Sequence, residues 1–188
     1  MAPPRGPALS RHRGRLAAVR ARTSAGLLTA WDQLAGYDEA DINAYTTRVA
    51  PLLTGAKVAT VAEATAFYAL LLDMAPPPVV ATSVPTAPDL RAPFAATWHA
   101  LAQGRDYVEA VQVGRSTADA VGSTFIQSTA RQTGDAVVEA SGRPVRWVRV
   151  AEPGACEWCQ ERDGSTYGSA ADGDYGHERC FCSVTPAD

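Results

Sequence analysis

The sequence predicts a mainly α protein, with a helical body followed by a small C-terminal β-hairpin or knuckle. Three observations support this prediction. Apolar residues recur at steps of three and four through most of residues 13–142, which is the period of an amphipathic helix. A proline-dense stretch at 76–93 interrupts that pattern. All four cysteines lie in the last 33 residues, together with one histidine.

Composition and charge are those of a folded protein with two unlike ends. The chain has 188 residues, 46% of them hydrophobic and 20% charged, so it can bury a core as one domain with appendages or as two small domains. The formal net charge is −3, but six arginines precede the first acidic residue, Asp32. Residues 151–188 instead hold eight acidic residues against two arginines. The two ends are therefore expected to prefer opposite partners.

The N-terminal end is predicted to be a flexible arm that leads into helices. Residues 1–12 contain three prolines and no apolar pattern, so we expect a flexible basic arm. An N-terminal helical region of three helices should fill residues 13–75: one ending at Gly36, one capped by Asp38 and ended or kinked by Pro51, and one over about 56–73. The predicted buried stripes are Leu16, Val19, Thr23, Leu27, Trp31 and Leu34, then Ile42, Tyr45 and Val49, then Val58, Val61, Thr65, Tyr68 and Leu72.

The prolines of residues 76–93 predict a stiff, extended linker and the boundary between two packing units. A second helical region should fill residues 94–142. It begins with a short helix whose predicted core side chains are Phe94, Trp98 and Leu101.

Small residues are spaced by four in the long helix that follows, at Gly114, Ala118 and Gly122. A glycine costs about 1 kcal/mol relative to alanine inside a helix. Two glycines on one face therefore indicate a seam where another backbone comes close. A break between two shorter helices explains the same residues equally well.

Residues 143–188 are predicted to form a β element. The segment 144–150 is short, β-branched and aromatic, which is typical of a strand, and residues 182–185 are its natural partner. The cysteines follow the pattern Cys156-x2-Cys159-x17-His177-x2-Cys180-x-Cys182. Two thiolates three residues apart, closed by a second cluster after a loop, have the spacing of a tetrahedral zinc site. We therefore expect a zinc-stabilised knuckle.

Five side chains compete for the four positions of this site. Cys156 and Cys159 form one pair, and His177 supplies a third ligand. We favour Cys182 as the fourth ligand, because it would pin the returning strand against the strand of Trp147, but Cys180 fits the sequence as well. A thiolate-rich tetrahedron favours Zn²⁺ over Mg²⁺ or Ca²⁺, and four protein ligands make the site structural.

Other functions of these residues are less well supported by the sequence. A Cys-x-x-Cys redox pair requires an activated thiol, whereas the acidic neighbours Glu157 and Glu161 would raise thiol pKa values. No phosphate loop or catalytic motif is present, so we expect neither an enzyme nor a small-molecule substrate. Five arginines are candidates for contact with nucleic acid or an acidic partner, although a solvated helix face explains them too: Arg11, Arg13, Arg15, Arg20 and Arg22.

The C-terminal end resembles a known family of phage proteins. Trp147, Cys156-Glu-Trp-Cys159, Asp163-Gly164 and His177-Glu-Arg-Cys180-Phe-Cys182 ahead of Pro186 are similar to the terminal motif of phage Mu protein F-like head morphogenesis proteins. The resemblance covers residues 144–186 and is looser over the helical remainder. The family usually has proline where this chain has Glu178, and arginine where it has Phe181.

This resemblance implies a minor capsid protein of a tailed phage. Its partners would be the portal protein and the major capsid protein, with possible contact to packaged DNA, and its place the head interior near the portal, after assembly in the host cytoplasm. The absence of a long apolar run leads us to expect no secretion signal and no membrane partner. The alternatives are a zinc-knuckle adaptor that binds nucleic acid through its basic N-terminal arm, and a Cys-x-x-Cys redox protein.

Overall fold

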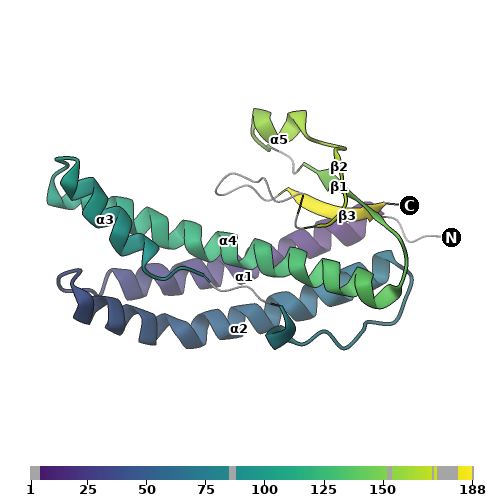
Figure 1. Ribbon diagram of the computed structural model, residues 1–188, viewed down its shortest axis with the longest axis horizontal. Helices are drawn as coiled ribbons and strands as arrows, with labels where there is room; N and C mark the ends of the chain where they lie inside the picture. Colours follow the sequence, from purple (N-terminus) through teal and green to yellow (C-terminus); the bar gives the residue numbers. More distant parts are fainter. Residues whose placement is uncertain (1–4, 85–87, 152–153, 171, 173–181, 188) are drawn as a thin grey trace.

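Three long helices form the body of the protein, and a small sheet lies at one end of it (Figure 1). The computed structural model describes residues 5–84, 88–151, 154–170, 172 and 182–187. The helices are α1 (Arg5–Trp31), α2 (Glu39–Leu71), α3 (Ala92–Ala102), α4 (Tyr107–Ser141) and α5 (Glu157–Glu161), with a 3-10 turn η1 (Ala81–Ser83). The strands are β1 (Arg146–Val150), β2 (Thr166–Tyr167) and β3 (Ser183–Ala187).

Helix α1 begins much earlier than the sequence analysis expected. It starts at Arg5, so residues 5–12 are helical where we expected a flexible arm. The reason is packing, because Ala8 and His12 are buried against the rest of the body. Pro7 lies in the first turn of the helix, where a missing backbone N–H costs little. The predicted stripe of α1 is confirmed at its centre, since Val19, Thr23, Leu27 and Trp31 are buried.

Helix α2 runs through Pro51 without ending, so the two helices expected on either side of this residue are one. Pro51 is exposed, and the buried residues Val49, Leu53 and Ala56 continue in helical step across it. The packing of this face outweighs the roughly 3 kcal/mol cost of an internal proline. The expected cap is confirmed: Asp38 Oδ1 accepts from Asp41 N at 3.0 Å, and Asp38 N donates back to Asp41 Oδ2 at 3.4 Å.

The proline-rich stretch does not separate two packing units. Trp31 of α1, Ile42 of α2 and Phe94 of α3 share one core cluster with Ile126 of α4, so helices from both sides of the stretch bury their side chains together. Three side chains predicted to be core are instead at the surface, and one of them is Leu101, which is 38% exposed. Trp98 is 44% exposed and Val58 is 54% exposed.

The small residues of α4 form a seam, as one of the two interpretations predicted. Helix α4 is continuous through Gly114 and Gly122, and Ala118 is fully buried. A Cβ atom added to Gly114 would overlap Thr97 Oγ1 and lie 2.5 Å from the Trp31 ring. One added to Gly122 would lie 2.5 Å from Leu27 Cδ1. The close neighbours are side chains of α1 and α3, where we expected a backbone.

Replacing Gly114 with alanine should therefore destabilise the body. The added methyl group must displace the Trp31 ring and Thr97, which are both fully buried. We expect the free energy of unfolding to fall by about 1–3 kcal/mol in chemical denaturation. Gly55→Ala is the matched control, because Gly55 is an exposed helical glycine with open space around its Cα. That change should raise stability by about 0.5–1 kcal/mol. A Gly114→Ala variant as stable as the Gly55→Ala variant would contradict the seam.

The sheet has the strand order β2-β1-β3, and both pairings are antiparallel. The predicted pairing of residues 144–150 with 182–185 is confirmed, with Val150 opposite Ser183. The edge strand β2 was not predicted. The sheet is anchored in the body, because the Trp147 ring packs edge-on to Tyr68 with centroids 5.4 Å apart. Both rings pack against Gly134 of α4, where an added Cβ would lie 2.7 Å from the Tyr68 ring and 3.0 Å from the Trp147 ring.

Candidate metal centre at the end of the sheet

Two of the predicted ligands meet where β1 ends and β3 begins. Since Val150 pairs with Ser183, the segment that leaves β1 towards α5 and the segment that enters β3 from Cys182 lie at the same end of the sheet. Cys159 on α5 and Cys182 are both buried, and they share a small cluster with Ala155. The structure therefore brings together one thiol from each half of the cysteine pattern.

The other predicted ligands are placed less fully. Cys156 is exposed at the N-terminal cap of α5, one turn before Cys159. His177 and Cys180 lie outside the described residues, so the choice between Cys180 and Cys182 stays a prediction. Within the described ranges, no group of three or more His, Cys, Asp or Glu side chains is arranged to hold a metal ion. The donors that are placed still suit Zn²⁺, because two buried sulfur atoms with a third cysteine nearby match its preference for thiolates.

Helical side chains hold the Cys182 end of β3 in place. Arg131 of α4 is buried and donates to the Cys182 carbonyl at 3.5 Å, while Tyr68 of α2 donates to the Val184 carbonyl at 3.1 Å. Arg13 of α1 donates to Ser183 Oγ at 3.0 Å and to the Val150 carbonyl at 2.7 Å. The backbone that carries Cys182 is thus fixed by three helices, independently of any ligand.

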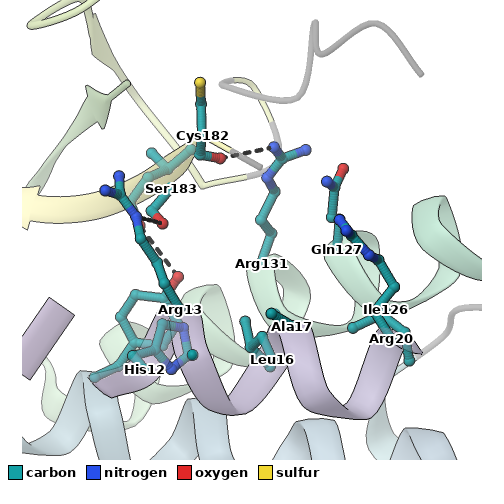
Figure 2. A pocket seen from close by; sticks show the side chains of 14 residues that line it. His12, Arg13, Leu16, Ala17, Arg20, Ile126, Gln127, Arg131, Cys182 and Ser183 are labelled. Atoms are coloured by element: carbon teal, nitrogen blue, oxygen red, sulfur yellow. Dashed lines mark hydrogen bonds between the residues drawn. The ribbon is translucent and has the colours of Figure 1, made fainter. Parts of the chain in front are cut away.

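A cavity of about 300 Å³ lies beneath this junction, between α1, α4 and the start of β3 (Figure 2). Arg13, Arg20, Gln127 and Arg131 line it together with Leu16 and Ile126. The Cys182 side chain points away from the cavity and from α1 (Figure 2). Its sulfur is therefore directed to the side of the sheet end that carries α5, consistent with its cluster with Cys159.

The five N-terminal arginines do not form one binding face. Arg13 donates hydrogen bonds to β1 and β3, and Arg20 lines the cavity. Arg15 is exposed and pairs with Glu63 of α2 at 2.9 Å. Arg11 and Arg22 are exposed. Of the five candidates for contact with an outside partner, Arg13 instead joins the first helix to the sheet through its guanidinium.

His12 also lines the cavity and is buried in the body. Its ring stacks on Phe67 with centroids 3.9 Å apart and a 5° angle between the planes. Burial lowers the pKa of His12 to about 4, and the nearby Glu63 carboxylate opposes this shift only in part. The imidazole is therefore neutral at pH 7, so its 3.4 Å contact with Glu63 is a hydrogen bond and not an ion pair.

Sequence analysis missed one residue of this region, Arg149. Arg149 is only 1% exposed, and its Nη2 atom donates to Cys159 Sγ at 3.7 Å. The signal was present in the sequence. Trp147 and Arg149 are two residues apart in a strand, so they share the face that the aromatic ring marks as buried.

A comparison with protein families covers both the body and the sheet. The model of the family described as VG15 protein matches residues 5–188. The chain belongs to the VG15 family. This match marks it as a viral, phage-type protein, in agreement with the coarser part of the resemblance noted from the sequence. Neither the curated proteins nor the solved structures contain a significant match.

The VG15 match runs from the first turn of α1 to the residue after β3, so it spans the helical body and the cysteine-bearing end as one unit. The packing of Trp147 against Tyr68 agrees with this extent. Among the described residues of this VG15 protein, no helix is both long and apolar enough to cross a membrane.

Proposed function

We propose that this VG15 protein is a minor capsid protein of the phage Mu protein F-like head morphogenesis type. It acts by contact with the portal protein and the major capsid protein in the head interior, during head assembly and DNA packaging, and not by catalysis. The VG15 match over residues 5–188 carries this proposal, because it marks a phage protein whose C-terminal cysteine motif resembles that family.

The cysteine-bearing end has a structural role in this proposal. Cys159 and Cys182 bind Zn²⁺ together with Cys156 and His177, and Cys180 is the alternative to Cys182. The shared cluster of Cys159 and Cys182 supports this ligand set. The bound ion would hold α5 and the following turn on the sheet, a region with few apolar side chains of its own, because the free energy of metal binding is added to that of folding.

The best-supported contact surface is at the opposite end of the body, where α3 meets the start of α4 (Figure 1). Four large apolar side chains are exposed there: Trp98, Leu101, Tyr107 and Val108. They are partly joined through Tyr37, since Trp98 Nε1 donates to its carbonyl at 3.2 Å and the Tyr107 ring lies 6.1 Å from its ring. We call these four residues the apolar tip. Neighbouring exposed aromatic and aliphatic side chains are typical of protein contact sites.

A binding experiment with Val108→Asp tests this function. Val108 is 69% exposed in the first turn of α4, where an acidic residue is well tolerated, so the fold should be retained. We expect binding to the portal or major capsid protein of the same phage, measured with purified subunits, to weaken by about tenfold or more. Val58→Asp is the matched control, because Val58 is 54% exposed on α2, away from the apolar tip. It should bind like the parent.

The outcomes also separate the other two functions. Absence of binding to either capsid component, with DNA retention that weakens as salt rises and is lost when the exposed Arg11 and Arg22 are replaced by glutamine, would favour a nucleic-acid adaptor. Cys159→His can keep metal ligation but ends dithiol exchange. Loss of function in head assembly by an otherwise folded, zinc-loaded Cys159→His variant would favour a redox protein.

A further inference from the structure

Arg149 is a buried cation whose position is fixed by the strand that carries it. Its backbone N donates to the Ser165 carbonyl at 2.9 Å, and its carbonyl accepts from Gly164 N at 2.9 Å. It also pairs with Val184 of β3. The start of its side chain is therefore held between both neighbouring segments, with little freedom to move towards solvent.

The guanidinium of Arg149 reaches the thiol of Cys159. Its Nη2 atom lies 3.7 Å from Cys159 Sγ, within hydrogen-bond range for sulfur. Its Cζ atom lies 5.0 Å from the centroid of the Trp158 ring, a cation–π distance. The residue next to Cys159 thus supplies an aromatic face, and Cys159 supplies the acceptor. Both contacts orient the guanidinium towards the sulfur.

Burial of an arginine is costly unless anionic acceptors surround it. A guanidinium has five N–H donors, no acceptor, and a positive charge at every accessible pH. Hydrogen bonds from such a donor are strongest to an ionised acceptor. A neutral thiol is a weak acceptor, whereas a thiolate bound to a metal ion keeps negative charge on the sulfur. The contact between Arg149 and Cys159 Sγ therefore suits a metal-bound thiolate better than an S–H group.

We propose that Arg149 is a positioning residue of the zinc centre, which donates a hydrogen bond to the Cys159 thiolate. This inference rests on the proposed zinc centre and names a residue outside its ligand set.

The test compares two arginines that both contact Trp158. Arg149→Met keeps most of the side-chain volume but removes the charge and the donors. We expect the zinc affinity, measured at fixed pH against a chromogenic chelator, to fall by roughly 10–100-fold, as is usual when an outer hydrogen bond to a ligand is lost. Arg162→Met is the matched control. The Arg162 Cζ atom is 3.9 Å from the Trp158 centroid, but its hydrogen bond goes to the Trp158 carbonyl and not to sulfur. The zinc affinity of the Arg162→Met variant should stay within about threefold of that of the parent protein.

A spectroscopic readout separates positioning from general stability. In Co²⁺-loaded protein, the thiolate-to-metal absorption band should shift in Arg149→Met and stay in place in Arg162→Met, because only Arg149 donates to a ligand sulfur. If Arg149→Met does not fold, Arg149→Lys keeps the charge with fewer donors and should show an intermediate loss of affinity.

Each result has a distinct meaning. A parent protein that binds no stoichiometric zinc or cobalt under reducing conditions overturns the zinc centre, and this inference with it. A parent that binds about one zinc ion, with Arg149 and Arg162 variants that match it in affinity and in band position, overturns the role of Arg149 alone.

Discussion

Replacing Cys159 with serine should abolish stoichiometric zinc binding and loosen the region around α5. Cys159 is the most deeply buried of the cysteines that the structure describes, and it provides the sulfur that Arg149 contacts. The parent should hold about one zinc ion per chain by elemental analysis, and the variant close to none. Structural zinc contributes roughly 10 kcal/mol or more of binding free energy at pH 7, so a large local effect is expected.

The extent of this loosening is set by the packing of the sheet. The sequence predicted a β element over residues 143–188 that is stabilised by zinc. Because Trp147 is buried against Tyr68 and Gly134, we now expect residues 146–150 to stay folded in Cys159→Ser. Limited proteolysis should cut after residue 151, while the helical circular dichroism and the emission of buried tryptophan change little. Ala155→Ser, in the same cluster, is the control and should keep its zinc. A Cys159→Ser variant with the zinc content and protease resistance of the parent would overturn the metal centre.

Acid should destabilise the body well above the pH at which most carboxylates are protonated. His12 has a pKa of about 4 in the folded protein because of its burial, against 6.5 when exposed. Between these two pKa values His12 binds a proton in the unfolded chain but stays neutral in the folded protein. The free energy of unfolding therefore falls as pH drops from 6.5 to 4. Above pH 6.5 both states are neutral at this residue and the effect vanishes. At 1.36 kcal/mol per pKa unit, the total loss is about 3 kcal/mol.

Denaturant titrations at several pH values measure this effect. His12→Phe keeps a ring that can stack on Phe67, and it removes the titrating group. The variant should lose most of the stability change between pH 6.5 and 4. His99→Gln, at an exposed position on α3, should keep the slope of the parent. The assignment to His12 fails if His12→Phe and the parent lose equal stability over this range.

Helical period and capping residues were sufficient to predict most of the helical body. The stripe from Val19 to Trp31 and the cap at Asp38 follow local rules, and the structure confirms both. The errors occurred where tertiary packing overrides local preference. Pro51 lies on the exposed face of α2, and the buried apolar residues of the other face continue past it, so the helix continues through Pro51. Residues 5–12 have little helical signal alone, and they are helical because Ala8 and His12 find buried contacts that no local pattern specifies.

The cysteine spacing predicted candidate ligands for the site, but it could not predict the side chains that surround them. Spacing alone selected the ligand candidates, and the structure brings Cys159 and Cys182 together. Sequence spacing could not show which arginines turn inward. Arg13 and Arg11 are both in a basic run, yet only Arg13 faces β1 and β3 when the helix packs. Long-range contacts of this kind depend on the docked positions of whole elements, which a local pattern does not contain.

The hydrogen bond from Arg13 to Ser183 joins residues that are 170 positions apart. At a synthesis rate of about 5–20 residues per second, α1 leaves the ribosome roughly ten to thirty seconds before its partner strand exists. During this interval its inner face can be covered first by α2 and later, once residues 107–141 have been made, by α4. A nascent chain can therefore assemble its helices early, but the contact that joins α1 to the sheet forms only after Ser183 has been made.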